Sequence, residues 1–161
     1  SVSGRYQLLS QIPPFIFLGQ GPLQSPSVFN FFSPFYAPAG EIRDSNFVAP
    51  ELQIATEYQN TLVTNYAFYQ TFFATSENAG RPALTDDDVL IDVSAEMAIA
   101  DDPDALIDLV AGKLLAGQIS QVLRDEISGM LAIIADPDDD ALRVAETIYL
   151  VVTSPEYAFQ R

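Results

Sequence analysis

After position 85 the apolar residues recur at intervals of three and four, and this spacing restricts the fold more than any other feature of the chain. Such a period places apolar side chains on one face of an α-helix. The chain shows no sustained alternation of apolar and polar residues, which would indicate strands. The pattern therefore predicts an all-α fold, with amphipathic helices following one another between residues 85 and 153.

The helix boundaries are marked by residues that bind free backbone groups. Thr85 is a candidate N-cap, and Asp88 stands three residues later, where the acid of a capping box belongs. Asp102-Pro103, Ser120 and the run 136–140 mark three more helix starts. Gly117 is a candidate stop. The predicted inward faces are Val89, Val93, Met97 and Ala100; Leu106, Leu109, Val110 and Leu114; Val122, Leu123, Ile127, Met130, Leu131 and Ile134; and Leu142, Ala145, Ile148, Val151 and Val152.

Three further helices are predicted outside this region. A long helix is expected over 49–74, with Pro50 in its first turn. A short helix is expected near 4–11 and a final turn near 157–160. The long helix carries an aromatic stripe that is more typical of a core than of a ligand groove; its members are Tyr58, Tyr66, Phe68, Tyr69, Phe72 and Phe73.

Residues 12–50 combine many prolines with many aromatic residues. Proline at this density excludes long helices, and the aromatic residues favour ordered burial over a flexible linker. We predict one domain over residues 1–161: a helical bundle of about five to six helices, preceded by an irregular segment that packs on helices.

The segment 25–38 is the predicted contact surface. Two alternatives are open for its aromatic rings: they pack on the chain's own helices, or some of them face another protein. The predicted binding residues are Phe29, Asn30, Phe31, Phe32, Phe35 and Tyr36.

Composition excludes several functions. The chain has no His and no Cys, so by itself it cannot form a Ser-His-Asp triad, a Cys-His pair or a typical zinc site. The net charge is −15, and residues 81–161 hold most of the acidic side chains, which disfavours nucleic acid and anionic membrane surfaces as partners. No apolar run reaches the ~20 residues that a membrane-spanning helix needs, so no membrane insertion is predicted.

The acidic clusters at 86–88, 101–104 and 136–140 each stand at a predicted helix start. We interpret them as caps, because a calcium loop beginning at Asp136 would need Gly and Glu where Ala141 and Thr147 stand. The scattered Asp and Glu residues give no specific signal for glycoside hydrolysis, and no glycine-rich phosphate loop is present. No catalytic residue, metal or cofactor is predicted.

Several strings of the chain resemble a known pattern: 19–34 (GQGPLQSPSVFNFFSP), 48–54 (VAPELQI), 114–117 (LLAG) and 148–161 (IYLVVTSPEYAFQR). Together they resemble the C-terminal part of the bacterial family called domain of unknown function 1800. Members are typically much longer, helical and often exported, and they are commonly encoded beside a sulfatase-like protein. The resemblance implies a secreted or periplasmic location and supplies no catalytic residues.

Two functions of different classes follow from these observations. The first is a non-catalytic interaction or scaffold module of an exported bacterial protein, whose partner is the N-terminal remainder of that protein or another protein. The second is the C-terminal lobe of an enzyme, such as a hydrolase, whose catalytic residues lie upstream. Because the chain starts at Ser1 rather than Met, we expect it to be a processed or truncated piece of a longer protein.

Overall fold

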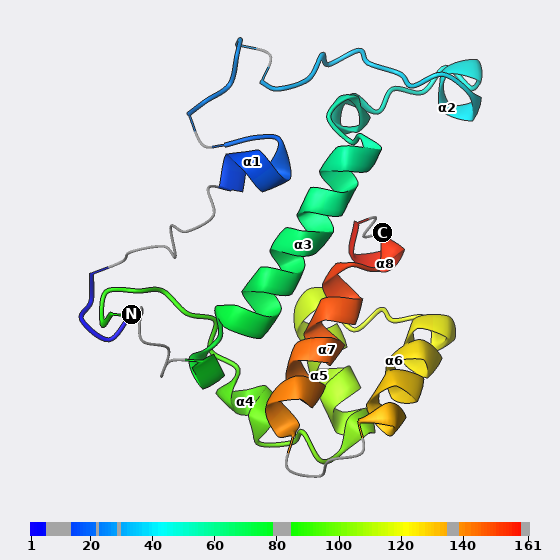
Figure 1. The fold of residues 1–161 in the computed structure, drawn as a ribbon. Coiled ribbons are helices and arrows are strands. Elements are labelled where there is room, and N and C mark those ends of the chain that lie inside the picture. The colour runs from blue at the N-terminus through cyan, green and yellow to red at the C-terminus, as the bar shows by residue number, and fades with distance from the viewer. Residues whose placement is uncertain (6–13, 22, 29, 79–84, 135–138, 159–161) are drawn as a thin grey trace. The chain divides into compact units, whose positions relative to one another are not determined.

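The structure is a computed structural model that describes residues 1–5, 14–21, 23–28, 30–78, 85–134 and 139–158. These residues form helices and turns and no strand, which confirms the all-α class (Figure 1). The α-helices are α1 (Pro14–Leu18), α2 (Glu41–Asp44), α3 (Glu57–Phe73), α4 (Ser94–Met97), α5 (Pro103–Leu114), α6 (Gln121–Ile133), α7 (Asp140–Val152) and α8 (Pro155–Ala158), and the 3-10 turns are η1 (Pro50–Gln53) and η2 (Ser76–Asn78).

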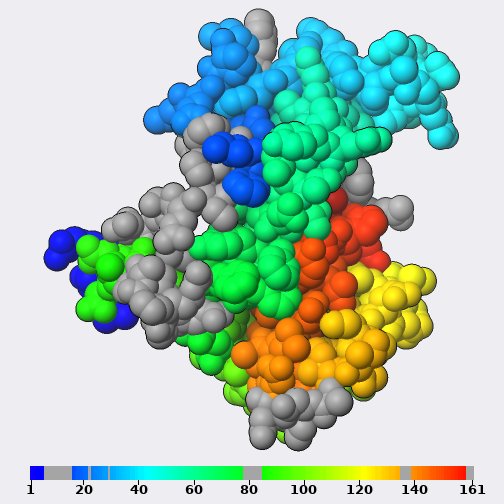
Figure 2. Space-filling model, viewed as in Figure 1, coloured from blue at the N-terminus to red at the C-terminus, as the bar shows by residue number. Residues whose placement is uncertain are grey.

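The chain forms two compact units, and only the larger one contains fully buried residues among those described. The larger unit consists of residues 1–9 and 67–161, and the smaller unit of residues 10–66. In the larger unit α5, α6 and α7 pack against one another, and α4 and α8 contact α7 (Figure 1). Figure 2 shows α6 in yellow lying directly against α7 in orange. The core contains Val93, Ala100, Leu106, Ile107, Val110, Leu115, Ile127, Leu131, Ile134, Val144 and Val151.

Side-chain caps begin the three long helices of this core, as the sequence predicts. Asp102 accepts a hydrogen bond from the Ala105 N–H at 3.1 Å and begins α5. Ser120 accepts from the Leu123 N–H at 3.1 Å and begins α6. Asp139 accepts from the Leu142 N–H and begins α7, whereas Asp136 and Asp138 lie outside the described residues. These three side chains satisfy helix donors, which is the role predicted for them.

Gly117 lies just after α5, as predicted, with a φ of +78°. Its N–H donates to the Ala111 carbonyl at 2.9 Å and so satisfies an acceptor at the helix end. The preceding Ala116 also has a positive φ, of +52°. The helix therefore ends in two left-handed residues, of which only one is the glycine that the sequence indicates.

The helix predicted from Thr85 is wrong in its start. Asp88 does accept hydrogen bonds from the backbone N–H and the hydroxyl of Thr85, as a capping-box acid would. The segment nevertheless forms an isolated turn, and the helix α4 begins only at Ser94. Residues 89–93 instead extend beside the end of α3, where Ile91 exchanges backbone hydrogen bonds with Ala74 and Ser76. Pairing with another segment thus overrides the local helix signal.

The long helix predicted over 49–74 also begins later than expected. Pro50 opens only the short turn η1, and α3 begins at Glu57. Thr56 caps α3, because its hydroxyl accepts from the Gln59 N–H at 3.1 Å. Thr56 and Gln59 have the spacing of a capping box, a signal that the sequence analysis missed.

Several smaller predictions are corrected too. Val122 points outward with 73% of its surface exposed, because it lies in the first turn of α6 rather than on the face toward α7. The aromatic stripe of α3 contributes no fully buried residue, and Tyr58 is 72% exposed. The helix expected near 4–11 falls mostly outside the described residues, and the final turn is placed at 155–158. Short helices α1 and α2 interrupt the segment predicted to be irregular.

The start of α6 is also held by a carboxylate from α8. Glu156 accepts hydrogen bonds from the backbone N–H of Ser120, at 2.9 Å, and from the Ser120 hydroxyl. These two bonds hold the pKa of the Glu156 carboxyl below its ordinary value. The pKa of Glu156 is therefore lower in the folded chain than in the unfolded chain. The ionised carboxylate stabilises the fold fully at pH values above its pKa in the unfolded chain. This stabilisation is lost as the pH falls through its pKa in the folded chain.

We therefore expect the Glu156→Gln variant to be less stable than the original chain at neutral pH. The difference between their free energies of unfolding should shrink towards zero on acidification, because both side chains are then uncharged. Urea denaturation of the two proteins, followed by circular dichroism between about pH 7 and about pH 3, measures this difference. A difference that stays constant over this range would contradict the assigned role of the carboxylate.

Candidate protein-interaction surface

Backbone turns and one distant side chain fix the predicted contact segment. Asn30 has a left-handed φ of +71°, and its N–H donates to the Ser27 carbonyl at 3.2 Å. The Ser33 N–H donates to the Oε1 atom of Gln53 at 2.7 Å. Asparagine tolerates the left-handed region better than most residues, so the turn suits its sequence. The η1 turn, which carries Gln53, therefore anchors the segment from 20 residues away.

A second set of contacts brings the residues after α2 to the end of this segment. The Ala49 N–H donates to the Tyr36 carbonyl at 2.9 Å. The Arg43 guanidinium donates to the Ala37 carbonyl through Nη2 at 2.7 Å and Nε at 3.2 Å. Because of these bonds, the backbone at Ala49 lies beside Tyr36 although it follows it by more than ten positions in the sequence.

The six predicted binding residues differ in exposure. Phe35 is exposed over 84% of its surface, and Asn30 is exposed as well. The other described members, Phe31, Phe32 and Tyr36, are half-buried. Phe29 lies outside the described residues. The structure thus divides the predicted set into rings that pack partly within the smaller unit and one ring that projects from it.

A pocket of about 260 Å³ opens beside Asn30. No charged side chain lines it within the described part of the chain. Its walls combine proline and phenylalanine surfaces with neutral polar groups, which suits an uncharged, mainly apolar group. The lining residues are Pro26, Ser27, Asn30, Phe31, Phe32, Ser33, Pro34 and Gln53.

Further exposed apolar residues of the smaller unit escaped the sequence analysis. We name five of the unit's residues, all more than half exposed, the exposed apolar set: Leu23, Val28, Phe35, Phe47 and Val48. Aromatic density drew attention to 29–36, whereas the aliphatic members and Phe47 carry no comparable local signal. None of the residues between 16 and 66 whose burial the structure describes is fully buried, so this unit has no dry core of its own there.

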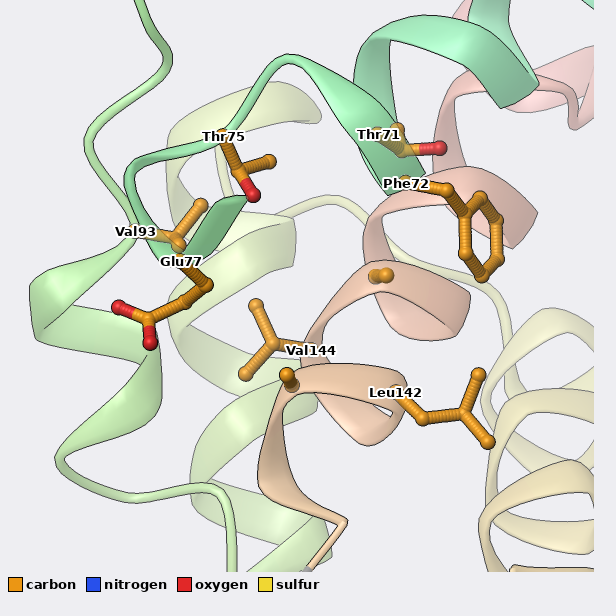
Figure 3. Close-up of a pocket in the computed structure, with 9 residues that line it drawn as sticks. Thr71, Phe72, Thr75, Glu77, Val93, Leu142 and Val144 are labelled. Carbon is orange, nitrogen blue, oxygen red and sulfur yellow. The ribbon is translucent and has the colours of Figure 1, made fainter. Parts of the chain in front are cut away.

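The larger unit carries a separate pocket of about 200 Å³ at the first turns of α7 (Figure 3). Two of its lining residues, Val93 and Val144, are buried. Figure 3 shows the Phe72 ring and the Glu77 carboxylate at opposite ends of the lining side chains. The complete lining is Thr71, Phe72, Thr75, Glu77, Val93, Ala141, Leu142, Val144 and Ala145.

Two other carboxyl groups of the larger unit have shifted pKa values. Hydrogen bonds from the backbone and side chain of Ser94 lower the pKa of Asp92, and desolvation raises the pKa of Glu146. Across the described residues, no group of three or more Asp or Glu side chains is placed to hold a metal ion. Within those same ranges no helix has the length and apolar character needed to cross a membrane.

No family model, curated protein or solved structure matches the chain. The function proposed below is inferred from the chemistry of the surfaces described above.

Proposed function

We propose that the chain is a non-catalytic interaction module that binds another protein, or another part of its parent protein, through the exposed apolar set of the smaller unit. One observation carries the proposal: the described part of this unit contains no fully buried residue and leaves large apolar side chains in water. Contact with water is unfavourable for large apolar side chains, and contiguous apolar patches on a protein surface mark interaction sites.

The composition of the surface supports a protein partner over other ligands. Aromatic side chains such as Phe35 and Phe47 are enriched at the centres of protein interfaces. Arg43 is held at the Ala37 carbonyl, and the same unit carries exposed acids at Glu41, Asp44 and Glu51. Such a surface repels phosphate, which argues against nucleic acid and anionic lipid headgroups.

The resemblance of residues 19–34 to domain of unknown function 1800 supports the wider setting of the proposal. On that basis the module belongs to a longer, exported bacterial protein, and its location is periplasmic or extracellular. The exposed apolar set would then be covered by the N-terminal remainder of that protein or by a separate protein.

Site-specific photo-crosslinking tests the proposal. A photoreactive phenylalanine analogue at position 35 should crosslink to one defined protein segment in the source cells. The same analogue at position 122, which is also well exposed but lies in the larger unit, is the matched control and should give no such product. The crosslinked segment is then purified or synthesised, and its affinity for the chain is measured by calorimetry.

We expect Phe35→Ser to weaken that affinity about 30-fold, as loss of a central aromatic contact does. The same variant should change the free energy of unfolding by less than about 0.5 kcal/mol, because the ring is exposed in the free chain. Val122→Ser should affect neither quantity. A large loss of thermal stability in Phe35→Ser, with the chain monomeric before and after, would identify the ring as internal and refute the proposal.

A further inference from the structure

The pocket of the larger unit is held open by fixed backbone contacts. The Ser76 N–H donates to the Ile91 carbonyl at 2.8 Å, and the Ile91 N–H donates to the Ala74 carbonyl at 2.9 Å. The Val93 N–H donates to the Ser76 hydroxyl at 3.2 Å. These bonds place the chain on both sides of Thr75 against Val93, and the first turns of α7 form the opposite wall (Figure 3). The pocket is thus built by three segments that are far apart in the sequence.

One end of this pocket's lining is apolar, and the other end carries a charge. The inner walls combine valine, alanine and leucine side chains with the buried threonines Thr71 and Thr75, and the Phe72 ring lies at one end. The Glu77 carboxylate is the only charged group of the lining among the described residues, and it lies at the other end. None of the ion pairs between described residues involves Glu77. The site therefore offers a largely buried lining and one negative charge, on the exposed side chain of Glu77 at its edge.

We propose that this pocket binds a small organic cation that carries an alkyl group and an ammonium group. The alkyl group lies against Val93 and Val144, and the ammonium group faces the Glu77 carboxylate. A volume of about 200 Å³ suits a group of this size, since an apolar cavity of roughly 150 Å³ already holds benzene. The net charge of −15 raises the local concentration of cations and disfavours anions of the same shape.

Three probes, each with an unbranched chain of four carbon atoms, separate the contribution of the apolar contact from that of the charge. We use n-butylammonium, n-butanol and butyrate in titrations followed by the backbone amide resonances of the intact chain, at constant ionic strength. Butylammonium should shift the amides of Thr75, Val93 and Ala145 with a dissociation constant in the millimolar range. Butanol should bind the same residues at least about threefold more weakly, and butyrate should cause no saturable shift.

Variants of the lining test each contact separately. Glu77→Gln should remove the preference for butylammonium over butanol while leaving butanol binding in place. Glu51→Gln, an exposed glutamate in the other 3-10 turn, is the matched control and should leave the preference unchanged. Ala141→Leu, at an exposed lining position, should weaken all binding by filling the pocket without disturbing the core.

Three results would overturn the proposal. The first is the absence of saturable butylammonium shifts at the pocket up to tens of millimolar. The second is equal binding of butyrate and butylammonium. The third is butylammonium binding that survives both Glu77→Gln and Ala141→Leu, while the amide spectra of these variants show an intact fold.

Discussion

Replacing Ile127 by alanine is expected to lower the free energy of unfolding by about 2–5 kcal/mol, the usual cost of truncating a fully buried isoleucine. Ile127 has 0% of its surface exposed and lies in the core where α6 meets α5 and α7. The neighbouring side chains are themselves closely packed, so they can collapse only partly into the space that the lost atoms leave.

Ile133 provides the matched control on the same helix. It is the same residue type but is 75% exposed, and Ile133→Ala should change the free energy of unfolding by less than about 0.5 kcal/mol. Urea denaturation followed by far-ultraviolet circular dichroism measures both variants. Similar losses for the two substitutions would contradict the orientation of α6, because they would mean that both faces of the helix are buried.

The second large effect is expected at the ion pair between α4 and α5. The Lys113 Nζ atom lies 2.6 Å from the Oε1 atom of Glu96, whose side chain is only 5% exposed. The other carboxylate oxygen of Glu96 is buried and has no hydrogen-bond partner among the described residues. We expect Lys113→Met to lower the free energy of unfolding by about 1–3 kcal/mol, because it leaves a buried carboxylate without its main partner. Half of the Lys113 side chain is exposed, so water offsets part of the loss.

The double variant Glu96→Met with Lys113→Met separates loss of packing from loss of charge. It removes the buried charge together with its partner and keeps similar side-chain volumes, so most of the lost stability should return. The four proteins of this cycle are compared by urea denaturation, which gives the coupling energy between the two residues. A double variant that is less stable than Lys113→Met alone would show that Glu96 contributes through contacts other than this ion pair.

The helix starts at Asp102, Ser120 and Asp139 could be predicted because each cap bonds a backbone group only three residues away. The core faces of α5, α6 and α7 followed from their apolar period. The start at Thr85 could not be judged in this way. The hydrogen bonds between Thr85 and Asp88 close only an isolated turn. Backbone pairing of Ile91 with the residues that follow α3 keeps the next residues extended instead of helical.

The candidate surfaces depend still more on distant contacts. Local sequence could not tell the exposed Phe35 from the half-buried Phe32, because the bond between Ser33 and Gln53 spans 20 positions. The pocket near Glu77 combines residues from 71 to 145, and no local pattern marks it. Sequence reasoning therefore singled out the segment 25–38 but not the orientation of its rings, and it gave no sign of the second pocket.

The separation of aliphatic and aromatic residues has a spectroscopic consequence. The core cluster of the described residues is aliphatic, and the chain has no tryptophan. Tyr149 of α7 instead contacts the rings of Phe68 and Phe72 on α3, with centroids 5.9 Å away in both cases. Because fixed aromatic contacts give rise to near-ultraviolet dichroism, part of that signal reports on the packing of the last turns of α3 against α7. Local detachment of α3 would therefore be optically visible while the helical signal of the core stays intact.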